Sequence, residues 1–165
     1  MKNIYKISAV FFVGLSIIVS SCKKEELIIE GCTDSNAMNY LSNATSNNGS
    51  CIYAYKIMED TWGVQEYNCD GFLMGSLLGQ VDSLDIQAGD DEGDLIIDFG
   101  DAGQLSASIT RDGEIDIPLQ TALSLGSLSG DGKLNSNSNA IIGLTITMGV
   151  PPLVTTEICD ITLTL

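Results

Sequence analysis

A stretch near the C-terminus reads Cys159-Asp160-Ile161-Thr162-Leu163-Thr164-Leu165, with apolar and polar residues in strict alternation. Successive side chains of a β-strand point to opposite faces, so this stretch predicts a strand with one buried and one exposed face. The same period runs through Leu105–Thr110 and Glu114–Ile117. Between those two lies Arg111-Asp112-Gly113, and Asp-Gly is a favoured two-residue hairpin loop. The alternation therefore predicts short antiparallel strands.

The whole of residues 56–165 is predicted to form one all-β domain. Short apolar runs recur along it, separated by breaks rich in Gly and Asp, which is typical of an antiparallel meander forming a sandwich or a barrel. A second hairpin turn is expected at Gly130-Asp131-Gly132-Lys133. No stretch shows a sustained helical period, so no helix is predicted. The further strands are expected over 61–68, 72–86, 94–99, 123–128, 141–148 and 154–165.

Residues 1–21 have the layout of a secretory signal peptide. Lys2 and Lys6 form a basic tip, residues 7–19 are apolar, and small residues stand directly before Cys22. As a helix the apolar run would span only about 20 Å, too short to cross a bilayer. The junction resembles the lipobox of bacterial lipoproteins, which implies that Cys22 is lipidated, becomes the first residue and anchors the protein to the outer membrane. A soluble secreted protein cut before an incidental cysteine is the alternative.

Residues 22–30 form a charged tether. Its Lys23-Lys24-Glu25-Glu26 run resembles the surface-export signal of lipoproteins from the Bacteroidota phylum. That resemblance implies that the protein faces the cell exterior. An ordinary charged tether is the alternative.

Residues 31–55 form a small polar module. Gly31-Cys32-Thr33-Asp34, Asn39-Tyr40 and Gly49-Ser50-Cys51 resemble a short disulfide-linked module common in surface proteins of the same phylum. Those relatives usually carry an acidic pair before the Gly-Ser-Cys, where this chain has Asn47-Asn48. Because calcium sites usually need several carboxylates, the loss favours a folded collar between tether and main domain over a calcium-binding module.

The remaining four cysteines are expected to form disulfides outside the cytosol. Four cysteines allow three pairings, and we expect Cys32–Cys51, which brackets the module, and Cys69–Cys159, which joins the two ends of the β-rich region. In the chain-entropy relation these loops are worth roughly 3 and 4–5 kcal/mol. The chain has no histidine and no CxxC pair, which argues against a structural zinc site.

The β domain resembles the C-terminal domains of Bacteroidota lipoproteins, including a lipocalin-like set. The resemblance rests on Trp62-Gly63-Val64, on the early and late cysteines, and on Gly126–Gly130 followed by a strand. It implies a lipocalin-like barrel in which Trp62 closes the base. An ordinary core aromatic is the alternative for this residue.

Charge and composition limit the function. Removal of residues 1–21 takes away Lys2 and Lys6 and leaves five basic against 22 acidic residues, a net charge of −17, which argues against nucleic acid as a partner. The absence of histidine removes the commonest general base, so we do not expect an enzyme. Acids gather in turns, where Asp and Gly are favoured; Gly89–Asp94 is the best calcium candidate of the β domain, yet no metal or other cofactor is expected.

These observations predict an outer-membrane-anchored lipoprotein, exposed at the cell surface, with a non-catalytic binding or structural role. Its partners are the membrane, through lipid on Cys22, and an envelope protein, a glycan or a small ligand. A lipocalin-like carrier of a small apolar ligand is the alternative, and it requires an interior that its side chains leave open.

Overall fold

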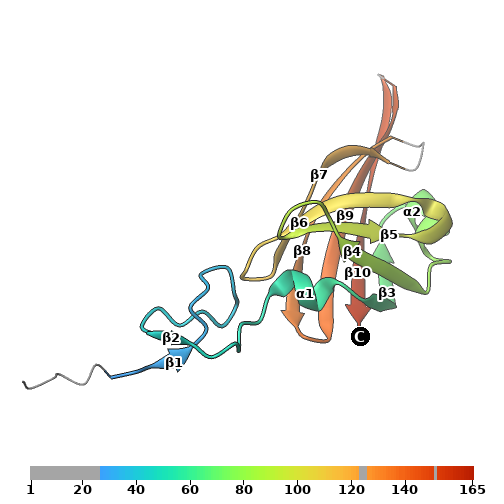
Figure 1. Cartoon of the computed structure of the whole chain (residues 1–165). Coiled ribbons are helices and arrows are strands. Elements are labelled where there is room, and N and C mark those ends of the chain that lie inside the picture. The colour runs from blue at the N-terminus through green and yellow to red at the C-terminus, as the bar shows by residue number, and fades with distance from the viewer. Residues whose placement is uncertain (1–26, 123–125, 151) are drawn as a thin grey trace, which may run out of the picture.

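The alternating stretches of the sequence pair side by side into a closed antiparallel barrel (Figure 1). The computed structural model describes residues 27–122, 126–150 and 152–165. The predicted signal peptide over 1–21, the lipidation of Cys22 and the start of the tether lie outside these residues.

In the described residues, eight strands follow the order β10-β3-β4-β5-β6-β7-β8-β9, and β9 also pairs with β10, so the sheet is a closed ring. Each strand therefore pairs with its neighbours in sequence, and the eighth pairs with the first. This confirms the all-β antiparallel meander and decides for the barrel over the sandwich. The strands are β3 (Thr61–Cys69), β4 (Ser83–Ala88), β5 (Asp94–Asp98), β6 (Gln104–Ile109), β7 (Glu114–Ala122), β8 (Gly126–Ser136), β9 (Asn139–Val150) and β10 (Leu153–Thr164).

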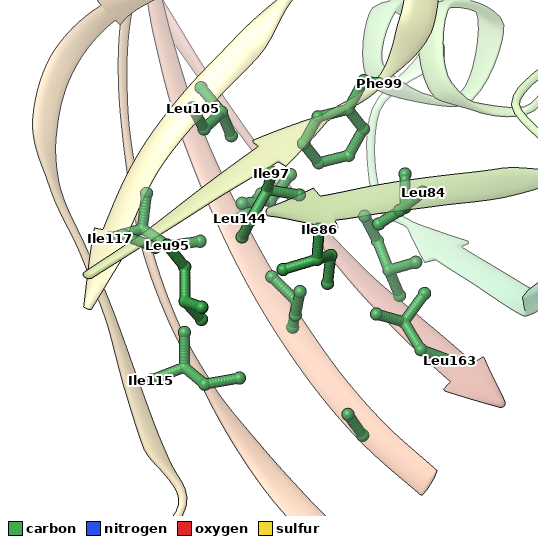
Figure 2. Close-up of a cluster of buried hydrophobic side chains, with 14 of the residues drawn as sticks. Leu84, Ile86, Leu95, Ile97, Phe99, Leu105, Ile115, Ile117, Leu144 and Leu163 are labelled. Atoms are coloured by element: carbon green, nitrogen blue, oxygen red, sulfur yellow. The ribbon is translucent and has the colours of Figure 1, made fainter. Parts of the chain in front are cut away.

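The barrel interior is filled by apolar side chains. Figure 2 shows side chains from the surrounding strands pointing toward one another in the enclosed space. Trp62 and Phe99 are among the largest buried side chains, at 0% and 2% exposure. No polar or charged residue that the structure describes is buried. The side chains labelled in Figure 2 are Leu84, Ile86, Leu95, Ile97, Phe99, Leu105, Ile115, Ile117, Leu144 and Leu163.

Two short helices, neither of which the sequence period predicted, add to the same core. Helix α1 (Ala54–Met58) directly precedes β3 and contributes Ala54 and Met58. Helix α2 (Phe72–Leu78) follows β3 and contributes Met74 and Leu78. Because β3 runs from one end of the barrel toward the other, the two helices extend the core at opposite ends.

The first and last barrel strands are joined covalently. Cys69 of β3 and Cys159 of β10 are direct partners in the strand register, and they form the predicted disulfide. Near the other end of the same pair of strands, Gly63 is paired with Thr164. The disulfide therefore fixes the register of the two strands that close the ring.

The predicted strand over 72–86 is wrong in its first half. Residues 72–78 form α2, and β4 begins only at Ser83. Met74 and Leu78 lie four positions apart and are both buried, which is the spacing of one helix face. An apolar run of this length is compatible with either structure, so the period alone could not distinguish them.

The predicted turn at Gly130–Lys133 is also wrong. These residues lie inside β8, which turns into β9 only after Ser136. A Cβ on Gly130 would lie 2.2 Å from the carbonyl oxygen of Gly143, so glycine here permits close approach of two strands. The other hairpin is confirmed: β6 and β7 meet at Asp112-Gly113, where Gly113 has φ +82°. Of the strand predicted over 123–128, residues 126–128 belong to β8 and the rest lie outside the described residues.

The join between β6 and β7 depends on a side chain. Backbone pairing covers only Ser108↔Asp116 and Ile109↔Ile115. Farther along β7, the amide of Gln120 takes over: its Oε1 accepts from the backbone N–H of Ser106 at 3.0 Å, and its Nε2 donates to the carbonyl of Ser106 at 2.8 Å. The side-chain amide of Gln120 thus replaces the backbone hydrogen bonds that β7 no longer makes with β6 at this point.

The N-terminal module lies beside the barrel end that carries α1 (Figure 1). Its two-residue strands β1 (Glu30–Gly31) and β2 (Ser46–Asn47) are parallel, and the predicted Cys32–Cys51 disulfide joins its ends. Ile29, expected in the tether, accepts a hydrogen bond from the backbone N–H of Thr45 at 2.8 Å. No helix in the described part of the chain is long and apolar enough to cross a membrane.

Candidate functional site

A groove of about 270 Å³ lies where the module meets the barrel. Four segments distant in sequence form it: the turn after Asp34, helix α1, the β4–β5 turn and the β6–β7 turn. An apolar floor and polar rims give it the composition of a small-molecule site. The lining residues are Asn36, Ala54, Tyr55, Glu92, Gly93, Ile109, Thr110 and Arg111.

Hydrogen bonds fix the module wall. The hydroxyl of Tyr53 donates to Asp34 Oδ2 at 2.7 Å, and the backbone N–H of Asn36 donates to Asp34 Oδ1 at 2.9 Å. Arg111 Nη1 donates to the carbonyl of Ser35 at 3.1 Å, a contact between residues 76 positions apart. Asn36 is therefore held opposite the barrel by contacts on both sides.

Helix α1 supplies the aromatic side of the groove. Its buried residues Ala54 and Met58 anchor it in the barrel core, and Trp62 Nε1 donates to the carbonyl of Met58 at 3.0 Å. Trp62 is thus buried at the barrel end beside α1. The anchored helix presents Tyr55 to the groove, with the ring centroid of Tyr53 5.4 Å away.

The barrel turns form the third wall. Gly93 has φ +92°, a conformation that favours glycine, and its carbonyl accepts from the N–H of Ile109 at 2.8 Å. This contact fixes the neighbouring Glu92. In the β6–β7 turn, Thr110 Oγ1 accepts from the N–H of Glu114 at 3.2 Å, which orders the stretch that carries Arg111.

The tyrosines around the groove stay protonated at neutral pH. The hydrogen bond to Asp34 raises the pKa of Tyr53 to about 12, and burial, followed by the charge of Glu92, raises the pKa of Tyr55. The backbone N–H of Asn36 and the hydroxyl of Tyr53 lower the pKa of Asp34. Tyr55 therefore offers an uncharged hydroxyl and an aromatic ring.

The positive charge of Arg111 is offset by the carboxylate of Asp112. Its Nε lies 3.4 Å from Asp112 Oδ1, and its Nη1 is used by Ser35. The guanidinium has five N–H donors, so further donors are available while its charge is offset by a carboxylate. The groove can therefore offer donors from Arg111 and acceptors from Glu92 without strong preference for an anion.

The predicted site residues lie in three places. Cys32 and Cys51 staple the module that bears Asn36, whereas Cys69 and Cys159 lie toward the barrel end opposite α1. The Gly89–Asp94 turn, our best calcium candidate, contributes Glu92 and Gly93 to the groove. In the described residues, no group of three or more Cys, Asp or Glu side chains is arranged to hold a metal ion.

Sequence reasoning missed Tyr55, Glu92, Thr110 and Arg111 as site residues. No motif connects them, because they come from segments that only the folded chain brings together. One signal was available: Arg111 is the only arginine of the chain and stands in a hairpin turn. We assigned this residue to a turn and did not consider it as a site residue.

Further hollows occur elsewhere on the described surface. One of about 470 Å³ lies near α2 over Phe99, whose buried side chain also belongs to the core beneath it. Others lie over the outer faces of β5–β7 and β7–β10.

Comparison with protein-family models, with curated proteins and with solved structures finds no match to this chain.

Proposed function

We propose that the protein is an outer-membrane-anchored lipoprotein, displayed at the cell surface, that acts by non-catalytic binding. Two disulfides support the placement, because disulfides persist in oxidising compartments outside the cytosol. The signal-peptide pattern ending at Cys22 supports the lipid anchor. An envelope protein, a glycan or a small molecule is the class of partner.

The filled interior carries the proposal that binding takes place on the outside of the barrel. Small eight-stranded barrels hold a ligand only when their inward side chains leave room. Here the inward positions form a continuous apolar cluster that includes Trp62, Phe99 and Met58, with helices packed against it. This favours an outer binding surface over the lipocalin-like carrier.

Membrane fractionation tests the anchor. The full chain is expressed in a Bacteroidota host, and Cys22→Ser is expected to move it from the membrane to the soluble fraction. A matched variant, Cys32→Ala with Cys51→Ala, removes two other cysteines and should stay in the membrane. Retention of Cys22→Ser in the membrane would refute lipid anchoring at this residue.

Two measurements test the remaining parts. Protease added to intact cells is expected to degrade the protein if it faces the exterior; complete protection would place it on the inner side. Native mass spectrometry of the protein purified from its host separates outer-surface binding from the carrier. A stoichiometric apolar small molecule retained by the protein would favour the carrier.

A further inference from the structure

We propose that the groove between the module and the barrel binds one neutral sugar residue of a glycan. The inference rests on the proposed function and names the ligand class of an outer-surface site. It is carried by the size of the groove, by the kinds of groups around it and by the way its charges are already balanced.

The size of the groove suits one sugar ring. Its volume of about 270 Å³ lies just below the roughly 300–1,000 Å³ typical of sites for drug-sized ligands. Ala54 and Ile109 give it an apolar floor, and Tyr55 gives it an aromatic side. A sugar ring presents C–H groups on its faces, which can pack against such surfaces while the hydroxyls at its rim point outward.

The polar rim suits hydroxyl groups. Glu92 accepts hydrogen bonds, Arg111 donates them, and Asn36 and Thr110 do both. A hydroxyl both donates and accepts, so a polyhydroxylated ring can satisfy every one of these groups. Thr110 and Arg111 each have a partner within the protein, but an apolar ligand would remove the remaining donors and acceptors of the rim from water without replacing their hydrogen bonds, which costs free energy.

The charges disfavour ionic ligands. Asp112 already offsets the charge of Arg111, and the adjacent turn carries Asp90 and Asp91 beside Glu92, so an anion meets a negative field. A cationic ligand would compete with Lys56 for the face of the Tyr55 ring, because Lys56 Nζ lies 5.2 Å from the centroid of that ring and pairs with Glu59. A neutral ligand avoids both costs.

The walls are fixed before a ligand arrives. The Cys32–Cys51 disulfide, the Arg111–Ser35 contact and the anchored helix α1 hold all three walls by bonds within the protein. Pre-ordered groups lower the entropic cost of binding. For a ligand of about a dozen non-hydrogen atoms in a half-open groove, we expect a Kd on the order of 1 mM for the monosaccharide. Repeated units at a cell surface would raise the effective affinity.

The test is an NMR titration of the oxidised chain from residue 22, with Cys22→Ser to prevent lipidation. The probes are glucose, galactose, mannose, fucose and N-acetylglucosamine, with glucosamine as the cationic and glucuronic acid as the anionic counterpart. At least one neutral sugar is expected to shift the backbone amide signals of Asn36, Gly93 and Arg111 in a saturable way. Absence of saturable shifts with all five would overturn the proposal.

Variants locate the binding. Glu92→Gln and Tyr55→Ala are each expected to weaken the sugar about tenfold or more, the effect of losing one good contact. Exposed counterparts outside the groove, Glu66→Gln and Tyr40→Ala, should leave the Kd unchanged. Glu92 is exposed at a turn, so Glu92→Gln keeps the test valid even if Tyr55→Ala destabilises α1.

Two other results would contradict the inference. One is equal binding by the groove variants, which would place the sugar elsewhere; the other is tighter binding of a charged counterpart than of any neutral sugar. Neither result bears on the anchor, because fractionation is measured on the full chain in cells. Conversely, retention of Cys22→Ser in the membrane fraction would refute the anchor and would leave the result of the sugar titration unchanged.

Discussion

Removal of the Cys69–Cys159 disulfide should destabilise the barrel more than removal of the Cys32–Cys51 disulfide. The bridge joins residues 90 positions apart. For a loop of that length, the chain-entropy relation gives a loss of about 4.6 kcal/mol in the free energy of unfolding. The variant is Cys69→Ala with Cys159→Ala, since Cys159 is fully buried and serine there would bury a hydroxyl group.

The control is Cys32→Ala with Cys51→Ala. That bridge closes a loop of 19 residues, for which the same relation gives about 3.2 kcal/mol. Its cysteines lie outside the barrel core, so the loss should fall mainly on the module. The barrel transition itself should move far less than in the first variant.

Guanidinium chloride unfolding, followed by fluorescence, reports on the barrel because Trp62 is the only tryptophan and is fully buried. In thermal melts, an unfolding entropy of about 2.1 cal/mol/K per residue over about 110 residues converts the expected loss into a fall of about 20 °C. A loss below about 1 kcal/mol, or equal losses in both double variants, would refute the idea that the bridge stabilises by tying the closing strands.

Three further predictions follow from single contacts. Asp34→Asn should return the pKa of Tyr53 from about 12 toward 10, measured by tyrosinate absorbance. In the native protein the contact between these two side chains stabilises the module between about pH 4 and pH 10. This stabilisation is lost as the pH falls through the lowered pKa of Asp34 or rises through the raised pKa of Tyr53. Gln120→Leu should speed hydrogen exchange of the Ser106 amide and cost about 1 kcal/mol, because two hydrogen bonds to that backbone are lost. Trp62→Phe should cost about 2–3 kcal/mol in thermal melts, through a cavity and the lost bond to helix α1.

Each of these has its own control. Asp60→Asn should leave the tyrosine titration unchanged, and an unshifted Tyr53 in Asp34→Asn would contradict the first prediction. Gln87→Leu, on an exposed strand position, should not alter exchange at Ser106; unchanged exchange in Gln120→Leu would mean that the side chain does not bridge the strands. A Trp62→Phe variant as stable as the parent would show that the site repacks.

The sequence was informative wherever one residue pattern has one physical explanation. Strict alternation in 159–165 and the Asp112-Gly113 turn predicted their structures, and pairing by position predicted both disulfides. The pattern failed where two explanations compete. Phe72–Leu78 is too short to separate a helix from a strand, and glycines such as Gly130 and Gly132 are found both in turns and in strands that another backbone approaches closely.

The groove could not be predicted in the same way. Alternation identifies which face of a strand is buried, but it does not say which turns end up next to one another. Glu92 and Arg111 were assigned to turns, correctly, but their meeting with Tyr55 depends on how helix α1 packs on the barrel, and that of Asn36 with them depends on the contact between module and barrel. That contact is made by the Ser35 carbonyl, a backbone group, which leaves no mark on residue type.

The closing pair of β3 with β10 has a consequence for how this chain can assemble. A strand in a ring has two neighbours, so an incomplete ring always exposes two edges, and exposed edges recruit other chains. The pair that completes the ring is also the one with the largest separation along the chain, which makes closure slow compared with the local hairpins. Until it occurs, β3 and β10 remain open edges at which other chains can pair. The cross-link at Cys69 and Cys159 then acts as a latch, turning a transient state prone to aggregation into a ring without edges.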